Sequence, residues 1–218
     1  ASNPAEGALD AGDAPPWVAR RRAGERVISR ADALAVGEAA HAALESLEQG
    51  DDTPVLRRLR EAGHRALAAS SAGGDRGAAQ AELDELLENF AAGPLFERFC
   101  ALLPHIVARE LPMIAPPDAE EPALCAISGA IDMLYRDAEG RFVVADFKTD
   151  RVAPGCEDEA TQHYRRQGEI YVRAVRDALG LEAEPRFELW WLRSGKVTEL
   201  VPEKMSAPQS DQLDLFAS

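Results

Sequence analysis

The sequence predicts an α/β domain in which a central mixed β-sheet is flanked by helices and preceded by a helical N-terminal portion. Three observations lead to this prediction. The first hundred or so residues carry apolar side chains at helical spacing. From residue 106 onward, short apolar runs alternate with turn residues, as strands do. A strong helical pattern over 161–179 then separates two strand pairs, which is typical of a sheet with a helix packed against it.

The first predicted helix runs from Arg30 to about Gln49. Ser29 is a candidate N-cap, and Asp32 three residues later completes a capping-box pattern. Four residues share the apolar face of this helix: Leu34, Gly37, His41 and Leu44. We therefore expect His41 to point with the apolar stripe, and Gly37 to let another backbone approach closely.

Turn and helix-breaking residues delimit the remaining elements. Three further helices are expected over 55–69, 78–90 and 95–103. Strands are expected over 106–113, 123–135, 141–147, 186–192 and 196–201. A loop over 151–159 leads into the single helix 161–179, which Gly180 ends. The predicted domain spans 17–201, between a flexible linker over 1–16 and a polar, disordered tail over 202–218.

Composition narrows the class of protein. No apolar run approaches the roughly 20 residues of a membrane helix, and the N-terminus lacks the pattern of a signal peptide. The three cysteines are widely spaced, which predicts free thiols in a reducing compartment, the cytoplasm, and no iron–sulfur cluster. The net charge of −14 argues against a domain that grips nucleic acid by bulk charge. It leaves room for a catalytic domain to which another module delivers DNA.

Charged residues at the ends of two paired strands form the main candidate site. Asp146 and Lys148 are two residues apart and share a strand face, and Asp132 ends the preceding strand. Such a cluster can hold one or two Mg²⁺ ions, which activate a bound water, while Lys148 orients that water or neutralises charge. The alternative is a surface strand with Lys148 merely paired to Asp146. The preceding run is apolar on both faces, which favours a central strand and a functional site.

Other polar residues leave two interpretations open. His41 is either a core histidine with a satisfied hydrogen bond or a neutral ligand of the Asp132/Asp146 site. One face of the helix 161–179 carries Tyr164, Gln167 and Tyr171, which form either a core stripe or a contact to substrate. Arg165 and Arg166 lie on other faces, as phosphate contacts or as an ordinary solvated surface.

Five short motifs occur in one order along the chain: Gly37-x-x-x-His41-x-x-Leu44-Glu45, Glu110-Leu111-Pro112, Gly129-x-Ile131-Asp132, Asp146-Phe147-Lys148-Thr149 and Tyr164-x-x-Gln167-x-x-x-Tyr171. In this order they resemble the RecB/AddA-type nuclease domains of the PD-(D/E)XK superfamily. The resemblance covers about Trp17 to Leu200 and implies that superfamily's restriction-endonuclease-like core. Phe147 stands where the family usually has tyrosine.

The resemblance implies a role for each motif. His41, Asp132 and Asp146 would bind Mg²⁺, or Mn²⁺ in its place, together with the backbone carbonyl of Phe147. Lys148 would be the catalytic lysine. Gln167 and Tyr164 would lie beside the DNA, and Glu110 matches a family acid whose role is less defined. AddB-related members carry a four-cysteine iron–sulfur site. This chain lacks that cysteine layout and in this respect resembles the AddA/RecB branch.

In that branch the nuclease is usually the C-terminal domain of a large helicase, and this chain has no phosphate-binding loop for ATP. The resemblance therefore implies a Mg²⁺-dependent deoxyribonuclease, the exonuclease module of a helicase–nuclease in double-strand-break repair and recombination. Its partners would be DNA, a helicase portion of the same polypeptide or a helicase partner, and an AddB/RecC-like subunit. The alternatives are a catalytically silent DNA- or clamp-binding module and a restriction-type endonuclease.

One feature lies outside the predicted domain. The tail peptide Gln212-Leu213-Asp214-Leu215-Phe216 resembles the pentapeptide by which bacterial proteins bind the DNA sliding clamp. A disordered tail can place leucine and phenylalanine in an apolar groove. The alternative is an incidental amphipathic chain end.

Overall fold

A computed structural model describes residues 15–19, 28–47, 54–70, 74–115 and 127–200. The predicted linker, apart from Pro15 and Pro16, and the predicted tail with its clamp-binding peptide 212–216 lie outside the described residues. Cys100 and Cys156 are free thiols, as expected, and Cys125 is outside the described part. No helix among the described residues is long and apolar enough to cross a membrane.

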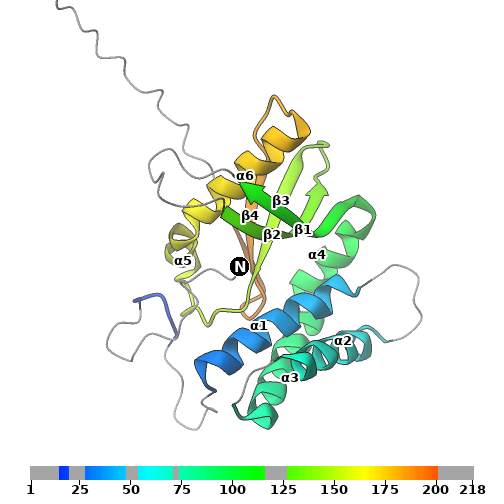
Figure 1. Cartoon of the computed structure of the whole chain (residues 1–218), viewed down its shortest axis with the longest axis vertical. Coiled ribbons are helices and arrows are strands. Elements are labelled where there is room, and N and C mark those ends of the chain that lie inside the picture. The colour runs from blue at the N-terminus through cyan, green and yellow to red at the C-terminus, as the bar shows by residue number, and fades with distance from the viewer. Residues whose placement is uncertain (1–14, 20–27, 48–53, 71–73, 116–126, 201–218) are drawn as a thin grey trace, which may run out of the picture.

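A five-stranded mixed sheet forms the centre of the domain, which confirms the predicted α/β fold (Figure 1). Its strands lie in the order β1-β2-β3-β4-β5. Their bounds are β1 Ile106–Ala115, β2 Ile127–Arg136, β3 Phe142–Lys148, β4 Arg186–Trp191 and β5 Lys196–Leu200. β3 and β4 are parallel, and the other three pairs are antiparallel. A parallel pair needs a crossover connection, which the chain between β3 and β4 supplies with two helices.

Four helices build the N-terminal portion: α1 Arg30–Glu45, α2 Val55–Ala69, α3 Arg76–Ala92 and α4 Pro94–Leu102, followed by a 3-10 turn over Leu103–His105. The capping box of Ser29 and Asp32 is present at the start of α1. The predicted stripe is wrong at Leu34, which is 38% exposed. α1 instead buries a face rich in alanine, with Ala35, Ala39 and Ala40 among its members, because small side chains let α2 and α3 pack closely against it.

The sheet separates two hydrophobic cores. Helices α1 to α4 gather on one side of it, and their core includes Leu44, Phe99 and Trp190 (Figure 1). The crossover helices cover the other side, where the core includes Val144 and Trp191. Neighbouring residues of a strand point to opposite faces, so the adjacent tryptophans of β4 each enter a different core. Each large apolar side chain buried in this way stabilises the fold by about 1.5–3 kcal/mol.

The crossover consists of α5 Glu157–His163 and α6 Arg165–Leu179, so the prediction of a single helix over 161–179 and a loop up to residue 159 is wrong. The helices divide at Tyr164, whose backbone leaves the helical conformation. Tertiary contacts to β5 hold α5 separately: Thr161 hydrogen-bonds Thr198, and Lys196 pairs with Glu157. The hydrophobic periodicity of a sequence gives no information about such contacts between distant elements.

Candidate metal centre

The candidate site lies where β2 and β3 separate. Their pairing ends at Met133↔Ala145, so Asp132 and Asp146 are the first residues beyond the last paired position on each strand. Both carboxylates are buried, with exposures of 7% and 3%. The amide of Phe147 donates to Asp132 Oδ2, so a carboxylate takes up this backbone group where the pairing has ended.

Glu110 on β1 reaches the same place through a local distortion. The β1–β2 register passes from Arg109↔Met133 to Leu111↔Ile131, so Glu110 lies level with Asp132 at a position where no pairing is formed. Glu110 has a φ of 43°, the left-handed region that non-glycine residues rarely adopt. Such strain costs on the order of 1–3 kcal/mol and often marks a functional residue.

His41 enters from α1 and completes the cluster. Its Nδ1 lies 3.0 Å from Asp132 Oδ1 and 3.9 Å from Glu110 Oε1. One ligand atom from each of His41, Glu110 and Asp132 lies within 4.8 Å of the others. The position of α1 explains this convergence in part. A Cβ at Gly37 would lie 3.2 Å from Thr149 Oγ1, so the close approach predicted at Gly37 is made to a side chain rather than to a backbone.

The electrostatics of the cluster favour a bound cation. Burial alone would lower the pKa of His41, but the charge and hydrogen bond of Asp132 outweigh burial and raise this pKa to about 9. Burial raises the pKa of Glu110, and the Asp132 charge adds to this shift. Burial also raises the pKa of Asp146, although Lys148 opposes the shift. Several acids thus share one small space, where a divalent ion would stabilise their charged forms.

Lys148, Asp146 and Gln167 form a second, adjoining network. The Lys148 ammonium lies 2.9 Å from Asp146 Oδ2 and donates to Gln167 Oε1 at 3.1 Å. The Gln167 amide donates to Asp146 Oδ1 at 3.0 Å and to the Tyr171 hydroxyl at 3.1 Å. Lys148 Nζ also lies 4.0 Å from the ring centroid of Tyr164, a cation–π distance. These contacts fix the ammonium beside the acidic cluster.

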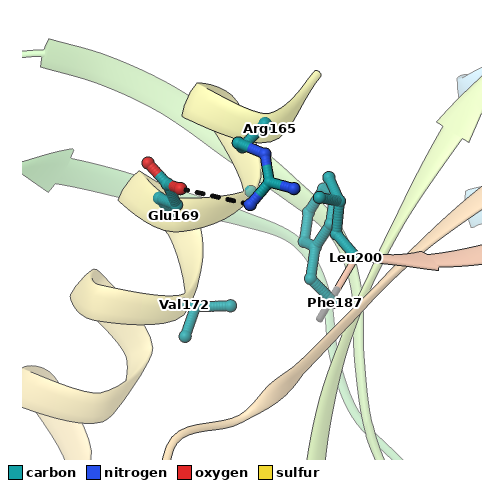
Figure 2. A pocket seen from close by; sticks show the side chains of 6 residues that line it. Arg165, Glu169, Val172, Phe187 and Leu200 are labelled. Atoms are coloured by element: carbon teal, nitrogen blue, oxygen red, sulfur yellow. Dashed lines mark ion pairs between the residues drawn. The ribbon is translucent and has the colours of Figure 1, made fainter. Parts of the chain in front are cut away.

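α6 can bring Gln167 this close because it lies directly on β4. A Cβ at Gly168 would lie 2.8 Å from Phe187, so a larger residue would push the helix away from the sheet. Figure 2 shows the small hollow beside this contact, with Arg165 paired to Glu169 at its edge. Its volume of about 10 Å³ has room for roughly one water. Arg165 lines this hollow, and Arg166 is exposed on the first turn of α6.

The structure adds residues that sequence reasoning passed over. Asp150 accepts a hydrogen bond from the Tyr164 hydroxyl at 3.0 Å, and its place directly after the Asp146–Thr149 motif was the available signal. The buried Glu82 pairs with the half-buried Arg151 and Arg193 next to Thr149. No spacing in the sequence relates these three residues, which lie on separate elements.

The donor atoms suit a hard divalent ion. Carboxylate oxygens from two strands and one imidazole converge, with the Asp146 carboxylate adjoining them, and Mg²⁺ or Mn²⁺ prefers such oxygen-rich sites. A buried lysine fixed beside acidic ligands is the further group that metal-assisted phosphodiester hydrolysis can use. Fold and site together point to the nuclease class of proteins.

Comparison with known families supports the nuclease class. Residues 16–218 match the PD-(D/E)XK nuclease superfamily, and the chain belongs to that superfamily. The AddA subunit of the ATP-dependent helicase/nuclease from Desulforudis audaxviator (strain MP104C) is 34% identical over 112 residues, which are 47% of this chain and 9% of the relative. The same-named protein of Pelotomaculum thermopropionicum (strain DSM 13744 / JCM 10971 / SI) is 33% identical over 112 residues, again 47% of this chain and 9% of the relative.

A third relative of that name, from Desulforamulus reducens (strain ATCC BAA-1160 / DSM 100696 / MI-1), is 34% identical over 74 residues, 34% of this chain and 6% of the relative. The chain thus matches less than a tenth of the length of these relatives. The family match and these names confirm the predicted resemblance to a RecB/AddA-type nuclease domain.

Proposed function

We propose that this domain is a Mg²⁺-dependent deoxyribonuclease that hydrolyses phosphodiester bonds of DNA. The observation that carries the proposal is the convergence of His41, Glu110 and Asp132 directly beside the Asp146–Lys148 pair. A structural ion pair would not require an imidazole and three acids drawn from four separate elements. Membership of a nuclease superfamily supports the same conclusion.

The metal ligands in this proposal are His41, Asp132, Asp146 and the carbonyl of Phe147, and the geometry adds Glu110 to them. When bound, the ion would polarise the scissile phosphate and lower the pKa of a bound water. His41 would have to release its proton to serve as a ligand, because only the neutral imidazole has a free electron pair. Asp132 would keep its contact with the Phe147 amide, which holds the carboxylate in one orientation.

Lys148 would orient the attacking water or neutralise charge that develops on the phosphate. Gln167 holds the Lys148 ammonium and the Asp146 carboxylate together, and the Tyr171 hydroxyl accepts the second hydrogen of its amide. Tyr164 supports the ammonium with its ring. In the proposal Tyr164, Gln167 and Tyr171 also lie beside the DNA backbone, and Arg165 and Arg166 supply phosphate contacts from the first turn of α6.

The names of the relatives support a wider role beside a helicase. We propose that the domain acts as the exonuclease module of a helicase–nuclease in double-strand-break repair and recombination. A helicase portion of the same polypeptide, or a helicase partner, would deliver DNA to a domain whose net charge of −14 attracts it poorly. Further proposed partners are a sliding clamp, bound through residues 212–216, and an AddB/RecC-like subunit.

The test is cleavage of linear single- and double-stranded DNA by the purified chain with Mg²⁺, with Mn²⁺, and after chelation by EDTA. Lys148→Ala should abolish cleavage while circular dichroism shows an intact fold. The control is Lys196→Ala, which removes a more exposed lysine on β5 that is paired at the same 2.9 Å distance but lies outside the proposed site. Full activity of Lys148→Ala would exclude the mechanism. A wild-type chain that binds DNA without cleaving it under either metal would favour the silent binding module.

A further inference from the structure

The backbone that follows the catalytic-lysine position is held by a side chain from the turn between β4 and β5. Beyond the end of the β3–β4 ladder, the amide of Leu192 donates to the Lys148 carbonyl at 2.9 Å. Arg193, in the turn between β4 and β5, then donates from Nε to the Thr149 carbonyl at 2.7 Å. The Arg193 guanidinium thereby adds one hydrogen bond to the chain after β3, at the position that follows the last backbone hydrogen bond between β3 and β4.

A buried acid fixes that guanidinium. Glu82 on α3 is 5% exposed, and its Oε1 lies 2.7 Å from a terminal nitrogen of Arg193 and 2.7 Å from one of Arg151. A buried charge is costly unless it is paired and hydrogen-bonded, so Glu82 would be penalised if either half-buried arginine turned away. Glu82 thus links the helical portion to both ends of the segment Thr149–Arg151.

Further contacts hold the same segment from other sides. Thr149 packs against the Gly37 position on α1, and Asp150 accepts from Tyr164. The described N-terminal segment 15–19 lies alongside, with Ala19 donating to the Arg151 carbonyl at 2.8 Å. Each residue from Thr149 to Arg151 therefore has a partner outside this segment and outside β3. A displacement of Thr149 would move Lys148, whose ammonium must remain between Asp146 and Gln167.

We propose that Arg193 and Glu82 are positioning residues for the nuclease reaction, acting through the Thr149 carbonyl on the placement of Lys148. The inference rests on the proposed function, in which Lys148 takes part in catalysis. Arginine is required at position 193 because its planar fork reaches a carbonyl and a carboxylate at once, whereas lysine has a single ammonium. Glu82 acts one step further away, by orienting that fork.

The decisive variant is Arg193→Lys, which retains the positive charge beside Glu82 but cannot keep both contacts in the same geometry. Small displacements of catalytic groups cost up to about 100-fold in rate, so kcat should fall by about tenfold or more, with KM for linear DNA within about twofold. Amide hydrogen exchange over residues 148–151 should speed up in the metal-free protein. Glu82→Gln should give the same pattern with a smaller loss.

The matched control is Arg186→Lys. The Arg186 guanidinium also pairs with an acid, Glu199, but this pair lies at the opposite end of β4. Weakening it should therefore leave kcat and amide exchange over 148–151 unchanged. An Arg193→Lys protein that is folded and keeps wild-type kcat would overturn the proposal. So would a loss of kcat matched by the Arg186→Lys control. If the wild-type chain cleaves no DNA, the proposed function fails, while the exchange comparison still decides whether Arg193 holds the segment.

Discussion

Two buried carboxylates on adjacent strands of this sheet have opposite surroundings. Asp146 on β3 faces α6, and Glu188 on β4 faces α4, one position apart in the β3–β4 register. Glu188 accepts hydrogen bonds from Arg98 at 2.7 Å, from the Tyr135 hydroxyl at 3.0 Å and from the Trp190 indole at 3.0 Å. Asp146 shares its space with further acids and receives hydrogen bonds or ionic contact from Lys148 and Gln167.

The difference separates a structural charge from one arranged for chemistry. Around Glu188 the donors match the acceptor, so the charge is neutralised within the fold and joins α4 to the sheet. Around Asp146, burial raises the pKa of Asp146 and of Glu110 and the charge of Asp132 adds to both shifts, while Asp132 also raises the pKa of His41. Perturbed pKa values of this kind are typical of functional sites. The acidic excess is what a divalent ion would offset.

The largest expected effect is on the Asp146 side. Asp146→Asn keeps the shape of the side chain but removes a charge that the proposed metal ion would need. Metal catalysis contributes several kcal/mol, so the rate of Mg²⁺-dependent cleavage should fall by about 10³-fold or more. Urea denaturation of the metal-free variant should show stability close to that of wild type, because relief of the buried charge beside Asp132 offsets the loss of the ion pair with Lys148. A variant that loses stability and keeps activity would reverse the comparison.

On the other face, Glu188→Gln should have the opposite signature. It weakens the hydrogen bonds from Arg98, Tyr135 and Trp190, which involve a charged acceptor, so the free energy of unfolding should fall by about 2 kcal/mol. Cleavage per folded molecule should remain at the wild-type level. Urea denaturation and an activity assay on the same preparation measure both. Lost cleavage in a protein that remains folded would show that the two faces are coupled.

His41 should determine how stability and metal affinity depend on pH. The pKa of His41 is raised from 6.5 to about 9 in the folded, metal-free protein, so its stabilising contribution is present below about pH 6.5 and is lost as the pH rises through about 9. Metal affinity should change in the other direction, rising up to about tenfold per pH unit as the proton leaves. Isothermal titration with Mn²⁺ and thermal melts between pH 6 and 9 check both trends. Both slopes should become shallower in His41→Gln, and unchanged slopes would contradict the assignment.

The smallest effects are expected from substitutions of Tyr135 and Tyr171. These tyrosines form a matched pair because burial raises the pKa of each to about 12. Tyr135→Phe removes one donor to Glu188 and should cost about 1 kcal/mol of stability without changing cleavage. Tyr171→Phe removes the acceptor that fixes Gln167 and should slow cleavage a few-fold. Parallel denaturation and kinetic measurements test the pair, and identical behaviour of both variants would weaken the distinction between the faces.

Sequence reasoning succeeded where the signal was local. The capping box of Ser29, the left-handed Gly180 that ends α6 and the hairpin of β4 and β5 all depend on a few neighbouring residues. It failed at Leu34 and at the division of the crossover into two helices. In both cases packing against distant elements, α2 and α3 or β5, outweighed the local pattern.

The candidate site shows the same division. The short motifs identified His41, Asp132, Asp146, Lys148 and Gln167 as candidate site residues. Residue type and strand alternation, on which the motifs depend, can be read from the chain itself. Glu110 was present in a motif, but its place in the cluster depends on a distorted β1 position opposite Asp132. Arg193 and Glu82 belong to no motif, since their only relation is a contact between a turn and a helix.

By itself, the sequence determined the α/β class, most of the elements outside the crossover, the chemical groups available and the resemblance to a nuclease family. Only the tertiary structure decided that His41 meets Asp132 across 91 residues and that Lys148 lies between Asp146 and Gln167. The physical reason is that periodicity encodes which face of an element is buried, whereas distances between elements depend on packing. Here that packing is set by small residues such as Gly37 and Gly168, and by the separation of β2 from β3.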